Sequence, residues 1–132
     1  RMQRHCENGK AIAEFLYNNA KIEKVYWPGF EHHPNYKIAK EQMNDFGGMI
    51  SFVPKGGSYE EAIKIVERLR VFTLAESLGG VESLVGHPAS MTHASIPKEE
   101  RLKSGIVDAL IRLSVGIEDV DDLIADLDQA IA

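Results

Sequence analysis

Apolar residues recur at helical spacing in three stretches of the chain. The first stretch spans residues 1–18, with apolar positions at Ile12, Phe15 and Leu16. The second follows Ser58, which forms a capping-box pattern with Glu61, and its apolar positions are Tyr59, Ala62, Ile63, Val66 and Leu69. The third follows Asp119, a residue type that caps helices, and its apolar positions are Val120, Leu123, Ile124, Leu127 and Ile131. The spacing therefore predicts three amphipathic helices.

Runs rich in β-branched and aromatic residues predict strands between these helices. The expected strands are residues 22–27, 49–53, 71–75 and 110–115. Two shorter helices are expected over 36–43 and 97–105. The segment 76–96 is rich in Gly, Ser and Thr and has little periodicity, which is typical of a binding or catalytic loop. The alternation predicts an α/β chain, an α+β sandwich in which helices cover one roughly four-stranded sheet.

Length, charge and cysteine content narrow the class of protein. A chain of 132 residues is long enough for one domain with a buried core. Its net charge of −5 disfavours nucleic acid and anionic membranes as partners. The single cysteine, Cys6, cannot form an internal disulfide, so we expect a reducing, cytoplasmic location. The histidines lack the spacing of a metal site. Because the chain opens at Arg1 directly into a helical pattern, we expect it to be a piece of a longer polypeptide.

Arg112 is the charged residue of an otherwise apolar strand. Strand alternation places Leu110, Arg112 and Ser114 on one face and the intervening apolar residues on the other. A guanidinium in such a setting needs a partner, because a buried unpaired charge is costly. Two partners fit: an internal Asp or Glu, or a ligand carboxylate, to which Arg offers two parallel N–H donors.

The loop that begins at Glu76 and Ser77 contains the diglycine Gly79-Gly80, which would let backbone come close to a ligand. It lacks the spacing of a phosphate-binding loop, so a simple glycine turn between strands is an equal alternative. Thr92, further along, could bind a ligand or cap the following helix. Alone, this loop does not define a site.

Five motifs together resemble one family. They are Val25-Tyr26-Trp27-Pro28-Gly29, Phe46-Gly47-Gly48-Met49-Ile50-Ser51-Phe52, Ala75-Glu76-Ser77-Leu78-Gly79-Gly80-Val81-Glu82-Ser83-Leu84, His87-Pro88-Ala89-Ser90-Met91-Thr92-His93-Ala94 and Leu110-Ile111-Arg112-Leu113-Ser114-Val115-Gly116-Ile117-Glu118. In this order they resemble the C-terminal domain of the Cys/Met-metabolism pyridoxal-phosphate enzymes, which include cystathionine γ-lyase, γ-synthase and β-lyase and methionine γ-lyase. The resemblance covers essentially residues 1–132.

The resemblance implies the small C-terminal domain of a fold type I pyridoxal-phosphate enzyme. In such enzymes the arginine matching Arg112 binds the substrate α-carboxylate, and the serine matching Ser77 helps to position the cofactor lysine and the substrate. Glu76 matches a glutamate near the distal end of the substrate in cystathionine γ-lyase, and Thr92 matches a threonine at the same entrance. The implied substrates are cystathionine or related sulfur amino acids, in γ-elimination or γ-replacement at a C–S bond.

The family's Schiff-base lysine, its phosphate loop and the aspartate under the pyridine nitrogen belong to a large domain, and no lysine of this sequence has the matching context. The resemblance thus implies that pyridoxal 5'-phosphate is bound mainly by that domain and that identical subunits form a homotetramer. Residues 1–18 match the end of an interdomain helix. We expect the chain alone to be inactive, because the cofactor is the electron sink for this chemistry. The alternative is a non-catalytic assembly, regulatory or amino-acid-binding module derived from the domain.

Overall fold

The computed structural model describes residues 2–30, 48–56, 58–74, 82–89, 99 and 109–131. Its helices and strands are α1 (Met2–Tyr17), β1 (Ile22–Tyr26), β2 (Met49–Pro54), α3 (Tyr59–Arg68), β3 (Thr73–Leu74), β4 (Leu84–Gly86), β5 (Ile111–Ser114) and α5 (Val120–Ile131). The three amphipathic helices expected from the sequence are confirmed. The helices expected over 36–43 and 97–105 lie outside the described residues, apart from Glu99.

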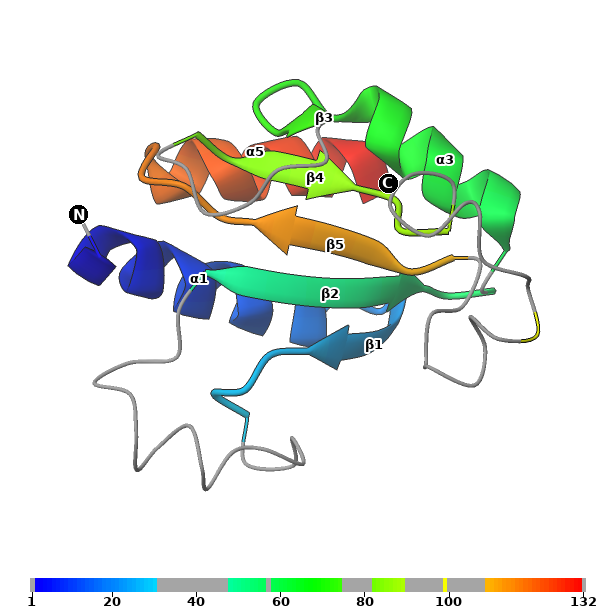
Figure 1. Cartoon of the computed structure of the whole chain (residues 1–132), viewed down its shortest axis with the longest axis horizontal. Coiled ribbons are helices and arrows are strands. Elements are labelled where there is room, and N and C mark those ends of the chain that lie inside the picture. The colour runs from blue at the N-terminus through cyan, green and yellow to red at the C-terminus, as the bar shows by residue number, and fades with distance from the viewer. Residues whose placement is uncertain are drawn as a thin grey trace.

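The strands form one mixed sheet in the order β1-β2-β5-β4-β3 (Figure 1). Neighbouring strands run antiparallel, except that β3 and β4 are parallel. The central strand is β5, although it is the last strand in the sequence of the described chain. The predicted α/β class is therefore confirmed, with five strands in the sheet.

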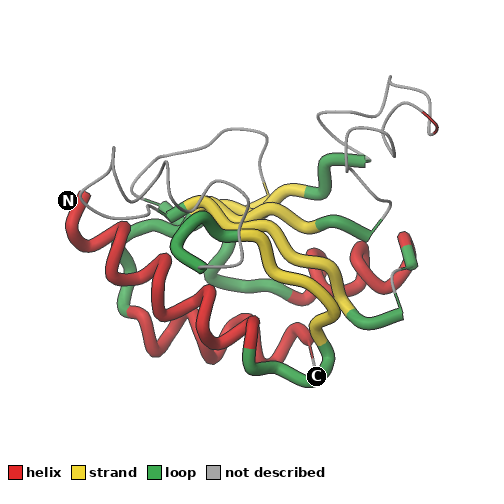
Figure 2. The backbone as a smooth tube through the Cα atoms, turned by 90° about the horizontal axis from the view of Figure 1, so that it is seen from below, coloured by secondary structure: helices red, strands yellow, loops and turns green. Residues whose placement is uncertain are grey.

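The core lies between the sheet and the helices, because α1, α3 and α5 all pack on one side of the sheet (Figure 2). Alternate strand residues face this side and are buried: Val25, Ile50, Phe52, Val85, Ile111 and Leu113. The helices contribute Ile12, Leu16, Ile65, Leu123 and Leu127, each fully buried. These helices do not cover the opposite face of the sheet, where Tyr26 and Met49 are exposed and Ser114 is buried.

One strand prediction and one loop prediction need correction. The strand expected over 71–75 begins at Thr73, because the N–H groups of Val71 and Phe72 bind the carboxylate of Asp126 instead of a neighbouring strand. The segment 76–96, expected to be irregular, contains β4. A three-residue strand that ends in glycine is too short to show periodicity, so its pairing with β5 decides its conformation.

The predicted helix caps are present at α3 and α5. The Ser58 hydroxyl accepts a hydrogen bond from the Glu61 N–H at 3.1 Å. The Asp119 carboxylate accepts from the Asp121 and Asp122 N–H groups at 2.9 and 3.4 Å. Both side chains satisfy amides that have no partner within the helix, which explains where α3 and α5 begin.

Candidate functional site

Arg112 lies in the middle of the sheet, on the face that α1, α3 and α5 leave uncovered. Its neighbours Ile111 and Leu113 are fully buried on the opposite, helix-covered face, so alternation directs Arg112 away from the core. The side chain is half-buried. The strand alternation predicted from the sequence is thus confirmed at this position.

The residues beside Arg112 in the adjacent strands are small. Ser51 of β2 lies opposite it on one side, and Gly86 of β4 on the other. Side chains at such paired positions share a face and would contact each other if they were long enough. Because Gly86 has no side chain and Ser51 a short one, neither fills the space around the guanidinium.

No hydrogen bond or ion pair to the Arg112 guanidinium is present in the described part of the chain. Of the two partners considered for this residue, an internal carboxylate is therefore not found among the described residues. A half-buried guanidinium without a protein partner can bind a carboxylate through two parallel N–H donors.

The other predicted substrate-binding residues, Glu76, Ser77 and Thr92, lie outside the described residues. The described segments that flank the first two are β3, which ends at Leu74, and Ser83, which precedes β4. Of the predicted substrate contacts, the structure therefore places Arg112 alone.

A hydrogen-bonded cluster holds the chain where it leaves β5. The Glu118 carboxylate accepts from both the N–H and the hydroxyl of Ser83, at 2.8 and 2.7 Å. The Ser83 hydroxyl in turn accepts from the Gly116 N–H at 2.8 Å. Ser83 is fully buried, so these bonds have little competition from water.

Helix α1 completes this cluster from the core side. The Asn8 side-chain amide donates to the carbonyl oxygens of Gly116 and Glu118, at 3.0 and 2.8 Å. The His5 ring Nδ1 lies 2.7 Å from the Val115 carbonyl oxygen and is the donor, since a carbonyl only accepts. We call His5, Asn8, Ser83 and Glu118 the β5 exit cluster.

Asp126 is a second buried carboxylate, and it holds the backbone that leads into β3. Its oxygens accept from the N–H groups of Arg70, Val71 and Phe72 at 2.8, 2.7 and 3.0 Å, and from the Gln129 side chain at 3.1 Å. The sequence analysis did not single out this residue. The available signal was an acidic residue at a core-facing position of an otherwise apolar helix face, next to Leu127.

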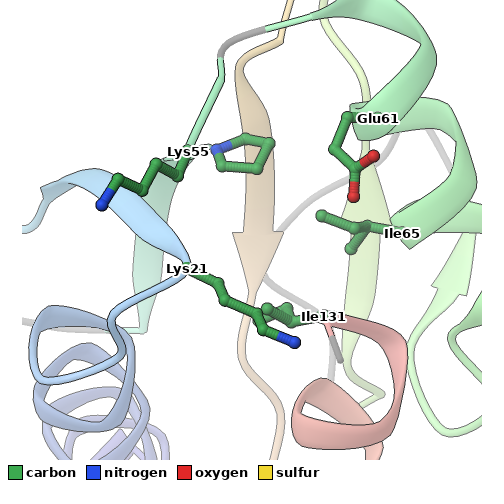
Figure 3. A pocket seen from close by; sticks show the side chains of 6 residues that line it. Lys21, Lys55, Glu61, Ile65 and Ile131 are labelled. Carbon is green, nitrogen blue, oxygen red and sulfur yellow. The ribbon is translucent and has the colours of Figure 1, made fainter.

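An open cavity of about 280 Å³ lies at the edge of the core and is lined by Lys21, Pro54, Lys55, Glu61, Ile65 and Ile131 (Figure 3), a set that does not include Arg112. Its apolar floor is formed by buried Ile65 and Ile131. In Figure 3 the Lys21 chain runs beside Ile131, whereas Lys55 points away from the two isoleucines. None of the described residues that line this cavity is aromatic.

Comparison with known proteins identifies the family. The sequence profile described as Cys/Met metabolism PLP-dependent enzyme matches residues 1–132. This chain belongs to that family. The expected resemblance is therefore confirmed, and the family's cofactor is pyridoxal phosphate.

Several Cys/Met metabolism PLP-dependent enzymes are similar to the chain over 99% of its length. L-methionine gamma-lyase of Fusobacterium nucleatum subsp. nucleatum is 55% identical over 131 residues, which are 33% of that protein. Cystathionine beta-lyase of Coxiella burnetii is 56% identical and cystathionine gamma-lyase of Dictyostelium discoideum 53% identical, each with 34% of its length covered. The chain thus spans about a third of the length of the curated relatives it matches.

Solved structures of Cys/Met metabolism PLP-dependent enzymes have the same fold. The crystal structure of cystathionine gamma synthase from Xanthomonas oryzae pv. oryzae in complex with cystathionine matches with a TM-score of 0.93 and 50% identity, over 99% of this chain and 34% of that one. Cystathionine gamma-lyase from Lactobacillus plantarum, complexed with L-serine, matches with the same TM-score and identity over 98% of this chain and 34% of that one.

The described residues do not form a pyridoxal-phosphate site by themselves. A lysine that binds the cofactor covalently needs an enclosed site, and the described lysines are all exposed: Lys10, Lys21, Lys24, Lys55 and Lys64. The cavity beside Lys21 and Lys55 is open and offers no aromatic ring to stack on the pyridine. In the described ranges no helix has the length and apolar character needed to cross a bilayer.

Proposed function

We propose that this chain is the C-terminal, substrate-binding part of a PLP-dependent enzyme that acts on cystathionine or a related sulfur amino acid by γ-elimination or γ-replacement. In this proposal Arg112 binds the substrate α-carboxylate. The observation that carries it is a guanidinium on the central strand, between Ser51 and Gly86, that has no partner among the described residues and lies on the sheet face free of α1, α3 and α5. The relatives support the substrate class, since their names specify methionine and cystathionine lyases.

Glu76, Ser77 and Thr92 complete the proposed site. Glu76 sets specificity at the distal end of the substrate, Ser77 positions the substrate and indirectly the cofactor, and Thr92 lines the entrance. These roles, like that of Arg112, are implied by the motifs that the chain shares with the family. Glu76 favours cystathionine chemistry over the other reactions of the family.

The cofactor and the carbon-acid chemistry belong, in this proposal, to a large domain outside the chain, with identical subunits forming a homotetramer. The exposure of every described lysine supports this division. Pyridoxal phosphate supplies the electron sink for the reaction when it is bound. The chain alone is therefore inactive. Adding pyridoxal phosphate to it should give no visible absorbance band from a lysine-bound cofactor, and such a band would contradict the proposal.

The role of Arg112 is tested in the complete enzyme that contains this chain, with L-methionine and L-methioninamide as paired ligands. L-Methioninamide has a neutral amide in place of the α-carboxylate. Removing one partner of a buried charge-assisted pair costs about 2–5 kcal/mol of binding free energy, and because Arg112 is partly exposed we expect a loss of about 2–3 kcal/mol. Arg112→Leu should therefore weaken L-methionine binding roughly 30- to 150-fold and leave L-methioninamide unchanged.

Arg112→Lys is the matched control, because it keeps the positive charge and removes the paired donors. Its affinity for L-methionine should fall between those of the wild type and Arg112→Leu. If Arg112→Leu binds both ligands as the wild type does, Arg112 is not the carboxylate-binding residue.

A further inference from the structure

The β5 exit cluster lies where it can fix the position of Arg112 within the sheet. Ser83 comes directly before β4, and Glu118 follows β5. Their two hydrogen bonds, together with the Ser83 hydroxyl and Gly116 N–H bond, join the start of one strand to the end of the other. The relative register of β4 and β5 is therefore held at this end by side chains.

Register decides which residue lies beside Arg112. In the observed register Leu84 is opposite Ser114 and Gly86 is opposite Arg112. A slip of one residue in β4 would bring Val85 opposite Arg112 and move it from the core to the other face. Since β4 has three residues, its own ladder holds this register weakly.

The Arg112 side chain has no hydrogen bond or ion pair among the described residues that could fix the guanidinium directly. Its position therefore depends on the backbone of β5. On the core side, Asn8 holds the carbonyl oxygens of Gly116 and Glu118, so the segment after β5 is fastened from both sides. The cluster thus links α1 and β4 to the strand that carries Arg112.

We propose that Glu118 is a positioning residue, which acts through Ser83 to hold Arg112 in the register that carboxylate binding requires. This inference rests on the proposed function of Arg112. Glu118 itself touches neither substrate nor cofactor in this proposal. Replacing its carboxylate by an amide removes the negative charge and leaves one oxygen to accept where two oxygens accept from the Ser83 N–H and hydroxyl.

The test measures the binding of L-methionine and L-methioninamide to the complete enzyme and to its Glu118→Gln and Ser83→Ala variants. Small misplacement of a binding group costs substantial affinity, so each variant should bind L-methionine about fivefold to tenfold more weakly, with L-methioninamide unchanged. The double variant should be no worse than the weaker single variant, because the two residues act as one unit. Glu67→Gln, an exposed change of the same chemistry on α3, should leave both ligands unaffected.

A purely structural role predicts a different result. The inference is overturned if Glu118→Gln weakens the binding of both ligands equally or of neither. It is also overturned if Glu118→Gln only lowers the yield of folded enzyme while Ser83→Ala keeps the wild-type preference for L-methionine. Should Glu118→Gln fail to fold, the Ser83→Ala ratio decides by itself. Failure of the proposed function gives a different result. In that case Arg112→Leu also keeps the wild-type preference for L-methionine over L-methioninamide.

Discussion

Removing the Asp126 carboxylate should cost this chain a large part of its stability. Asp126 is 5% exposed and accepts hydrogen bonds from three successive backbone N–H groups, at Arg70, Val71 and Phe72. In Asp126→Ala all three donors lose their acceptor. The Phe72 amide is buried and loses about 2 kcal/mol, and the other two amides, which water can reach, lose about 1 kcal/mol each. We expect the free energy of unfolding to fall by roughly 4 kcal/mol.

Urea unfolding of this 132-residue chain followed by fluorescence measures this loss, because Trp27 is its one tryptophan and is 3% exposed. Asp126→Asn keeps one acceptor oxygen and should lose about half as much, roughly 2 kcal/mol. Asp128→Asn is the matched control. It makes the same charge change at an exposed position of the same helix and should stay within about 0.5 kcal/mol of the wild type.

The reasoning would be refuted by an Asp126→Ala variant that loses less than about 1 kcal/mol, since water would then replace the carboxylate at little cost. A loss in Asp128→Asn as large as that in Asp126→Asn would also contradict it. In that case the negative charge of α5, and not the three hydrogen bonds, would be the cause.

Two further predictions concern a close backbone approach and a helix cap. In Gly48→Ala the added Cβ would lie 2.8 Å from the Val115 carbonyl oxygen. This clash should lower the free energy of unfolding by about 1–3 kcal/mol, measured by urea unfolding. A variant as stable as the wild type would show that the backbone moves aside at no cost. Ser58→Ala removes the hydroxyl that accepts from the Glu61 N–H and should lower the free energy of unfolding by about 1 kcal/mol in the same assay. Ser58→Asp keeps a side-chain oxygen at this position and should retain the cap. Equal losses of stability in both variants would exclude capping as the cause.

Helix caps and strand alternation could be predicted from the sequence, because each depends on residues that are close together in the chain. Ser58 and Asp119 mark the starts of α3 and α5, and each caps its helix as expected. The alternation around Arg112 correctly placed Ile111 and Leu113 toward the helices, although Ser114 on the Arg112 face is buried as well. These features depend on neighbours within a few residues, so the sequence alone suffices to predict them.

Long-range pairing produced what the sequence could not predict. β4 forms because Val85 and its neighbours pair with β5, about 30 residues further along the chain. β3 begins only at Thr73 because a carboxylate from α5 binds the preceding amides. The small residues beside Arg112 are likewise known only once the strand order is known, since Ser51 and Gly86 are far apart in the sequence.

The candidate site was predicted in part. The charged residue in an apolar strand identified Arg112 as a candidate, and its binding of a ligand carboxylate stays a prediction. The β5 exit cluster was not predicted, because Asn8 and Glu118 are 110 residues apart and the sequence around each gives no sign that they are in contact. Glu76, Ser77 and Thr92 remain predictions.

The one-sided packing of α1, α3 and α5 gives the two surfaces of the sheet unequal freedom to change. Substitutions on the side of Phe52 and Leu113 must respect a filled interior, whereas those on the side of Tyr26 and Met49 meet no such demand from the helices. Most members of a directed-evolution library confined to the exposed positions of the second surface should therefore still reach the native topology.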